Sequence, residues 1–344
     1  MARRESQKWN LCMNYIVFDL EWNQNAGGKD GSVIGFPFEI IEIGAVKLND
    51  RLEQIDTFHQ LVKPQVYRKL HYKILEVTHM DMEMLKREGK PFPEAIQEFL
   101  DWCGDIRQDI RFCTWGSMDL TEIQRNMEFY YMENPFPMPL LYYDIQKLYK
   151  LLEGGDSVLS LDLAVAAMGL QEERPFHQAL DDAYYTAKVM EHMNFDKVKE
   201  YLSMDYYQLP TSREEEVYLK FPGYTKYVSR MFETKEDALK DKTVGDIVCP
   251  QCNRMLRKKI RWFSANQRLE LGLGVCPEHG YVRGKIRIKK AEGGEVFVIK
   301  TLKPVGDETL EDLNLRRDEA KKKRTERNKA KRQAQKKRNG LAAE

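Results

Sequence analysis

The stretch that most constrains the fold spans residues 15–22 and has the sequence YIVFDLEW. Apolar and aromatic residues lead into two carboxylates separated by one residue, which is typical of a buried strand that ends in acids. Because successive side chains on a strand point to opposite faces, we expect Asp19 and Glu21 on one face. Two neighbouring acids at the end of an apolar strand are costly unless a cation lies between them. A hard divalent metal, Mg²⁺ or Mn²⁺, fits such a pair; an exposed strand end with hydrated acids is the alternative.

The hydrophobic pattern of the first half predicts alternating strands and helices after this stretch. The predicted strands are 38–48, 57–62, 110–115 and 140–143, and the predicted helices are 93–103, 120–131, 145–152, 163–168 and 180–192. This order predicts the α/β class: a mixed sheet flanked by helices, antiparallel at its start and parallel afterwards. Acids at the strand ends suit such a sheet, because ligands collect at that edge.

Two further acids and a histidine occupy comparable positions. Asp119 lies where the strand 110–115 meets the next helix, and His177 precedes a helix start that carries Asp181 and Asp182. Each piece alone has an ordinary explanation, because acids are favoured in the first turn of any helix. Together with the first pair, however, four carboxylates can hold two metal ions against a scissile phosphate, and a histidine can take a proton from the attacking water.

These pieces resemble the three motifs of the DEDDh exonucleases, the superfamily of ribonuclease T and the polymerase proofreading subunit, whose fold is ribonuclease-H-like. The matching residues are Asp19 and Glu21 for the first motif, Asp119 for the second, and His177, Ala179 and Asp182 for the third. The resemblance spans about residues 14–195. The sequences of residues 39–46 (EIIEIGAV) and 112–116 (FCTWG) are most similar to those of the branch that trims interfering RNA, histone message and ribosomal RNA.

The resemblance implies a 3′→5′ exonuclease that releases nucleoside 5′-monophosphates. It assigns two Mg²⁺ or Mn²⁺ ions to Asp19, Glu21, Asp119 and Asp182, and the role of general base to His177; these five are the expected catalytic residues. It favours Asp182 over its neighbour Asp181 as the ligand. RNA with an accessible 3′ end is the expected substrate, DNA is the nearest alternative, and a non-catalytic RNA-binding protein on the same fold is another.

One position departs from the family pattern. Where the family often has Thr-Thr-Gly or Ala-Thr after the glutamate of the first motif, this chain has Trp22 and Asn23. In relatives this position lies near the 3′-terminal nucleotide, so Leu20 and Trp22 are candidate nucleic-acid contacts. Trp22 can stack on a terminal base or simply pack in the core or at its rim.

The second half carries four potential metal ligands at a characteristic spacing. Cys249 and Cys252 are followed, after a 23-residue interval, by Cys276 and His279. Two paired ligands of this kind predict one structural Zn²⁺ in a closed tetrahedral site, with free thiols as the alternative. Residues 244–303 resemble a zinc ribbon, and residues 196–243 are expected to form a helical or irregular connector. The remaining cysteines, Cys12, Cys103 and Cys113, are predicted to be buried thiols.

Basic and aromatic residues follow the first cysteine pair, and the candidate nucleic-acid contacts there are Arg257, Lys258, Lys259, Arg261, Trp262 and Phe263. The segment 282–290 adds more cations. Phosphate contacts and base stacking suit single-stranded nucleic acid; a solvated face or a protein contact is the alternative.

Charge is distributed unevenly along the chain. The net charge is +1, yet residues 316–338 contain 13 Lys/Arg and 3 Asp/Glu, a net of +10 that leaves −9 for the remainder. We therefore expect a basic tail at 304–344, helical or disordered, that contacts structured RNA or a ribosome. Residues 1–13 read as a lead-in without a secretory signal, and no apolar run suits a membrane span. Together with the cysteine usage, this predicts a cytoplasmic protein without a membrane partner.

Overall fold

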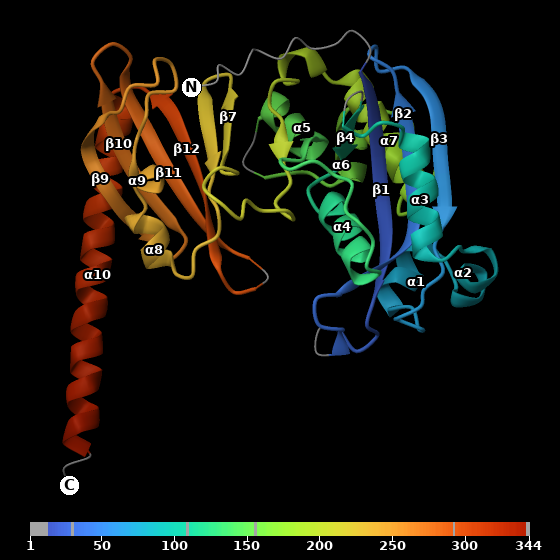
Figure 1. Ribbon diagram of the computed structural model, residues 1–344, viewed down its shortest axis with the longest axis horizontal. Coiled ribbons are helices and arrows are strands. Elements are labelled where there is room, and N and C mark those ends of the chain that lie inside the picture. The colour runs from blue at the N-terminus through green and yellow to red at the C-terminus, as the bar shows by residue number, and fades with distance from the viewer. Residues whose placement is uncertain (1–12, 29–30, 108–109, 155–156, 292, 342–344) are drawn as a thin grey trace. The chain divides into compact units, whose positions relative to one another are not determined.

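The computed structural model describes residues 13–28, 31–107, 110–154, 157–291 and 293–341. The chain divides into two compact units, Met1–Gln208 and Leu209–Glu344 (Figure 1). The predicted thiol Cys12 and nearly all of the predicted lead-in lie outside the described residues. Within the described part of the chain, no helix is long and apolar enough to cross a membrane.

The first unit is built on a six-stranded mixed sheet with the strand order β3-β2-β1-β4-β5-β6. Its strands are β1 (Asn14–Gln24), β2 (Phe38–Leu48), β3 (Gln54–Leu61), β4 (Ile110–Thr114), β5 (Leu141–Asp144) and β6 (Ser203–Met204). The first three pair antiparallel, β4 and β5 run parallel to β1, and β6 is antiparallel to β5. This arrangement confirms the predicted mixed, ribonuclease-H-like sheet.

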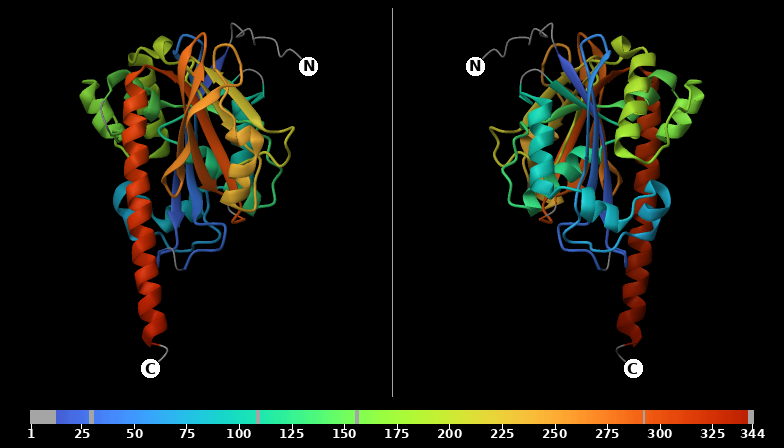
Figure 2. Two further views of the ribbon diagram at one scale, coloured as in Figure 1. Left: turned by 90° about the vertical axis from the view of Figure 1, so that its left-hand side faces the viewer. Right: turned by 90° about the vertical axis from the view of Figure 1, so that its right-hand side faces the viewer.

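Helices cover both faces of this sheet (Figure 2). They are α1 (Tyr72–Thr78), α2 (Met82–Glu88), α3 (Phe92–Cys103), α4 (Asp119–Phe129), α5 (Ile145–Glu153), α6 (Leu161–Ala167) and α7 (Ala179–His192). On one face Ile16, Phe18 and Leu20 of β1 are buried against apolar residues of α3 and α4. Strand alternation therefore directs Asp19 and Glu21 to the other face, on which α7 packs.

A glycine allows α7 to approach the sheet at the first motif. Asp19 lies opposite Gly44 in the β1–β2 pairing. A Cβ atom added to Gly44 would lie 2.0 Å from the backbone nitrogen of Leu180 and 2.1 Å from the carbonyl carbon of Ala179. Backbone atoms cannot rotate away, so only glycine fits between β2 and the start of α7. This contact carries the first turn of α7, and with it Asp182, to the strand that bears Asp19.

The second unit contains a six-stranded antiparallel sheet with the order β7-β8-β12-β11-β10-β9. Its strands are β7 (Val217–Phe221), β8 (Tyr224–Val228), β9 (Arg257–Asn266), β10 (Leu269–Cys276), β11 (Gly280–Lys290) and β12 (Val296–Val305). Two short helices, α8 (Lys235–Lys240) and α9 (Lys242–Gly245), pack on one face against Ile286, Ile288 and Val298.

The predicted connector 196–243 is corrected by this sheet. Its first part belongs to the first unit, and β7 and β8 form a hairpin that extends the second sheet. Pro222 and Gly223, which read as a break in the sequence, form the two-residue turn of the hairpin, and Gly223 has the positive φ (74°) that such a turn requires. The compact second unit therefore begins earlier than the ribbon-like segment 244–303.

The C-terminal helix α10 (Glu308–Leu341) forms much of the predicted basic tail. Leu313 is buried and Leu310 partly buried in an apolar cluster with Ile260 of β9 and Leu271 and Leu273 of β10. Beyond this contact the helix continues past the sheet (Figure 1). The helix thus has a short apolar attachment at its start and a long basic extension.

Candidate active site and metal centre

Three of the predicted acids meet above the carboxyl end of β1. One oxygen each of Asp19, Glu21 and Asp182 can be chosen so that all three atoms lie within 4.8 Å of one another. Ligand oxygens on opposite sides of a magnesium ion lie about 4.2 Å apart, because each Mg–O bond is about 2.1 Å. The three carboxylates therefore need only a small closure to share one divalent ion.

The fourth acid, Asp119, lies beside this group and outside it. Asp119 begins α4 and is buried, and its carboxylate accepts a hydrogen bond from the backbone N–H of Leu20. Its charge is also the strongest of the neighbouring charges that raise the pKa of Asp19. The second motif is thereby fixed to the strand that carries the first motif.

The surroundings of the four carboxylates make their ionisation unfavourable. The pKa of Asp19 is raised well above its usual value, that of Glu21 to about 9, that of Asp119 to about 7 and that of Asp182 to about 6. Burial is the largest cause in each case, and for Asp19 and Glu21 the neighbouring acids add to it. Carboxylate oxygens gathered in a partly buried cluster fit a hard divalent cation.

His177 lies next to the cluster through its backbone contact with Asp182 and is not one of the three residues whose ligand atoms are grouped. Its backbone N–H lies 3.3 Å from each carboxylate oxygen of Asp182, and its φ is 68°, an unusual left-handed conformation for a non-glycine residue. The residue is exposed, which leaves the imidazole accessible to a substrate. Asp181, in contrast, forms an ion pair with Arg174 at 3.1 Å, so Asp182 is the neighbour that joins the cluster.

Sequence reasoning did not single out Glu42 as a site residue. This buried carboxylate accepts a hydrogen bond from the N–H of Ala179 at 3.0 Å, and its other oxygen lies 2.7 Å from Nε2 of His59. The contact with Glu42 is the main reason that the pKa of His59 is raised. Glu42 therefore anchors the start of α7, and a glutamate in the middle of the apolar strand 38–48 was the available signal.

The two candidate contacts on β1 differ in exposure. The side chain of Leu20 is buried in the core, which does not favour its predicted contact with nucleic acid, and its backbone N–H donates to Asp119. Trp22 is partly buried and packs on Phe38, with 5.6 Å between ring centroids. Of the two alternatives for Trp22, the structure favours packing at the rim of the core.

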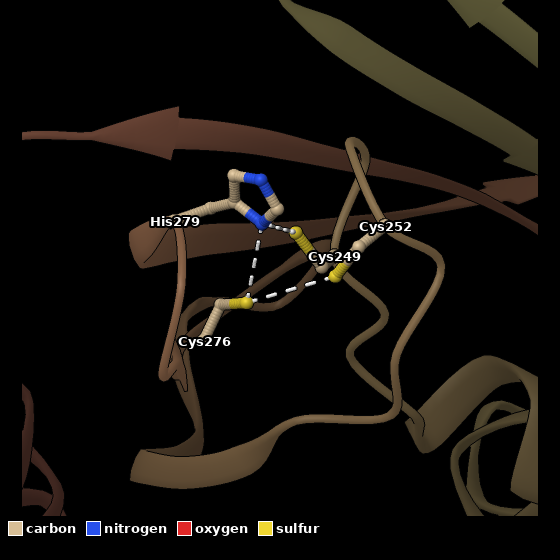
Figure 3. Close-up of side chains that lie close together, drawn as sticks. All are labelled: Cys249, Cys252, Cys276 and His279. Atoms are coloured by element: carbon tan, nitrogen blue, oxygen red, sulfur yellow. Dashed lines mark hydrogen bonds between the residues drawn. The ribbon is translucent and has the colours of Figure 1, made fainter.

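The four predicted zinc ligands converge in the second unit (Figure 3). The Sγ atoms of Cys252 and Cys276 are 3.7 Å apart, and Nδ1 of His279 lies 3.6 Å from Sγ of Cys249 and 3.5 Å from that of Cys276. A tetrahedral zinc ion with Zn–S bonds of about 2.3 Å and Zn–N bonds of about 2.05 Å separates its ligands by about 3.8 Å (S to S) and about 3.6 Å (S to N). The side chains thus have the spacing of a tetrahedral zinc site.

Both ligand pairs are held by the same kind of turn. A residue with positive φ follows the second ligand of each pair: Asn253 at 59° and Gly280 at 72°. The first pair lies in the loop before β9, and the second joins β10 to β11. Cys103 and Cys113, the other described cysteines, are buried free thiols as predicted.

The candidate nucleic-acid contacts of the second unit separate into two groups. Arg257, Lys258, Lys259 and Arg261 are exposed on β9, which is an edge strand. Lysine and arginine on an edge also prevent pairing with other chains, so exposure alone does not identify these residues as ligand contacts.

The two aromatic candidates do not face solvent as stacking platforms. Trp262 packs across Gly272 and Gly284, and its Nε1 donates to the Gly245 carbonyl at 2.7 Å. Phe263 packs on the other face, in the cluster with Leu313 of α10. Because successive side chains on a strand point to opposite faces, these consecutive aromatics enter two different cores, and this packing does not favour the base stacking predicted for them.

The fold and the first site together define a class of protein. A ribonuclease-H-like sheet that presents three clustered acids, a fourth beside them and an adjacent histidine is the arrangement of a metal-dependent nuclease of the DEDDh type. The model of the Exonuclease family (RNase_T) matches residues 16–190, about half of the chain, and the chain belongs to this family. The protein is a 3′–5′ exonuclease.

Solved structures with similar folds include other nucleases. The nuclease domain of 3′hExo, a DEDDh family member bound to rAMP, is 22% identical over 58% of this chain and 98% of that chain, with a TM-score of 0.48. Pop2p of S. pombe, in its Mg²⁺- and Mn²⁺-bound form, is 14% identical over 56% and 90%, with a TM-score of 0.44. No curated protein sequence matches the chain.

Proposed function

We propose that the protein is a 3′→5′ exoribonuclease that hydrolyses RNA to nucleoside 5′-monophosphates. The observation that carries the proposal is the meeting of Asp19, Glu21 and Asp182 beside Asp119. A non-catalytic RNA-binding protein would not need so costly a group of partly buried acids.

In the proposed reaction these four carboxylates would hold two Mg²⁺ or Mn²⁺ ions, whose chemistry would be to bind the scissile phosphate, activate water and stabilise the leaving oxygen. His177 accepts a proton from the attacking water as its oxygen bonds to phosphorus. The bond from phosphorus to the 3′-oxygen of the preceding nucleotide breaks, and that oxygen receives a proton. Glu42 and the Asp182–His177 contact hold the start of α7 in place for this step.

RNA is proposed over DNA on two grounds. First, the sequences of residues 39–46 and 112–116 are similar to those of the RNA-trimming branch of the family. Second, the second unit adds a basic surface and a basic helix to the nuclease. We also propose that Cys249, Cys252, Cys276 and His279 of the second unit bind one structural Zn²⁺. For α10 the proposed partner is structured RNA or a ribosome. DNA hydrolysis by the same chemistry is the second candidate.

Matched 5′-labelled RNA and DNA oligonucleotides with single-stranded and hairpin 3′ ends test the choice of substrate. With Mg²⁺ or Mn²⁺ we expect a ladder of 3′-shortened products on RNA and a much weaker one on DNA, and the stalling point on hairpins shows where trimming ends. A ladder chiefly on DNA contradicts the RNA assignment but keeps the exonuclease. No cleavage of either polymer contradicts the catalytic proposal.

The His177→Ala variant is expected to lose about 10²–10⁴-fold in turnover while the protein remains folded and still binds metal, because only the proton acceptor is removed. Single-turnover cleavage of labelled RNA and stabilisation of the protein by Mn²⁺ measure the two properties separately. The matched control is His192→Ala, which changes an exposed histidine at the far end of α7. Full activity of His177→Ala would remove this residue from the mechanism.

A further inference from the structure

A row of cations lies on one face of β11. Because side chains alternate along a strand, Arg283, Lys285 and Arg287 share one face, while Val282, Gly284 and Ile286 between them are buried on the other. The antiparallel pairing places Lys303 of β12 directly opposite Arg283. We call Arg283, Lys285, Arg287 and Lys303 the β11 stripe.

The stripe has no acidic partners. In the described part of the chain, none of its four residues forms an ion pair. Arg287 and Lys303 are exposed, and Arg283 and Lys285 are partly exposed. Burial and the charges of Arg287, Arg283 and Arg316 lower the pKa of Lys285, which shows that the cations lie close enough to repel one another.

A merely solvated sheet face would be expected to carry charges of both signs. Opposite charges across a strand pair stabilise a sheet, whereas like charges directly opposite destabilise it. The stripe consists of one sign only and includes the directly opposed pair Arg283 and Lys303. Among the described residues no acid forms an ion pair with the stripe, so its charge is available to a row of anions on another molecule.

The dimensions of the stripe suit a linear polyanion. Alternate residues on a strand are about 6.7 Å apart, so three of them present charges over about 13 Å in a straight line. The helix α10 starts on the same face, where Leu313 packs beside Leu271 and Leu273. Its Arg316 lies near Lys285 but forms an ion pair with Asp312 at 3.0 Å, so it is not counted in the stripe. The phosphodiester backbone of a nucleic acid supplies negative charges at regular intervals.

We propose that the β11 stripe binds the phosphate backbone of the RNA substrate, as a site separate from the nuclease centre and from the edge cations of β9. It rests on the proposed function, because it takes RNA as the substrate. The contact is electrostatic and independent of base sequence, so it increases the residence of the enzyme on long RNA without changing the chemistry of the active site.

Fluorescence anisotropy with a labelled single-stranded oligouridylate tests this site in the full chain, carrying Asp19→Asn so that the RNA persists. The triple variant Arg283→Ala, Lys285→Ala, Arg287→Ala is expected to bind about tenfold or more weakly. Its slope of log affinity against log salt should be shallower by about 2, at about 0.7 per lost phosphate contact on single strands. Its melting temperature should equal or exceed that of its parent, because like-charge repulsion is removed.

The matched control is Arg257→Ala, Lys258→Ala, Arg261→Ala, which removes the same charge from β9 of the same sheet. It should retain most of the affinity and of the salt slope. Equal losses in the two triples, or no loss in the stripe variant, would overturn the site. Hydrolysis of bis(p-nitrophenyl) phosphate by chains with Asp19 intact reports the active site alone, so a failure of the nuclease proposal is recognised separately from a failure of the stripe.

Discussion

The Asp19→Asn variant is expected to lose exonuclease activity by at least about 10²–10³-fold and yet, without divalent metal, to melt at a higher temperature than the parent protein. Loss of activity follows because the amide carries no charge for a shared cation, and such electrostatic stabilisation is worth several kcal/mol. The gain in stability follows because Asp19 is partly buried among other acids, and burial and their charges raise its pKa well above the usual value. Asparagine keeps the shape and removes the charge.

The pH dependence of the metal-free protein has a definite sign. The folded-state pKa values of Glu21, Asp119 and Asp182, about 9, 7 and 6, lie above those of an unfolded chain, which are about 4. The folded state therefore holds more protons than the unfolded state between these limits. The free energy of unfolding should fall as the pH rises from about 4 to about 9. Divalent metal, which binds the ionised acids, should stabilise the protein most at the upper end of this range.

Thermal unfolding followed by circular dichroism across that pH range, with and without Mn²⁺, measures both effects. Asp50→Asn, a change at an exposed turn position, is the control and should alter neither activity nor melting. A metal-free Asp19→Asn protein that melts below its parent would show that the acid cluster stabilises the fold by itself. That result would remove the argument that the acids are held together for a cation.

Replacing Cys252 with serine is expected to remove the zinc and to lower the melting temperature of the second unit by a large margin. Zinc binding at structural sites contributes about 10–16 kcal/mol in zinc-finger peptides, and part of this is folding free energy. Cys252 is the suitable position, because its side chain is exposed whereas Cys249 and Cys276 are buried. Serine therefore leaves no cavity, and the effect reports the loss of the metal.

Elemental analysis for zinc and differential scanning calorimetry test this prediction. Gln251→Ser, an exposed change in the same loop, is the matched control and should keep both the metal and the transition. Hydrolysis of bis(p-nitrophenyl) phosphate by Cys252→Ser should remain, because the acids belong to the first unit. A parent protein that contains no zinc and melts at the same temperature as Cys252→Ser would show that the cysteines are free thiols.

Local patterns were sufficient for most elements of the first unit. The strand predicted at 38–48 is β2, and the helix predicted at 93–103 is α3. In both elements the spacing of the apolar residues along the sequence is enough to predict the secondary structure. The carboxylates of the motifs could also be named in advance, because their chemistry is a property of the residue type and their spacing follows strand and helix geometry.

Features that depend on distant contacts could not be found in this way. Gly44 looks like an ordinary interruption of a strand until α7 is packed against it. Trp262 and Phe263 read as adjacent aromatics among cations, but both faces of β9 are covered, one by a core around Trp262 and the other by a cluster that includes Leu313 of α10. In the hairpin β7–β8, Val217, Leu219 and Phe221 alternate with polar residues as a strand requires, but Pro222 and Gly223 indicate a break in the sequence and form the turn only because β8 pairs with β7.

The close packing of α7 on Gly44 has a consequence for the newly made chain. Asp19 and Glu21 leave the ribosome early, Asp119 follows, and Asp182 emerges last of the four, on a helix that reaches the sheet only through this contact. An unfinished chain that ends before α7 therefore lacks the acid that completes the cluster. During translation the four acids can therefore come together only after α7 has been synthesised, so the nuclease centre is completed late in the synthesis of the first unit.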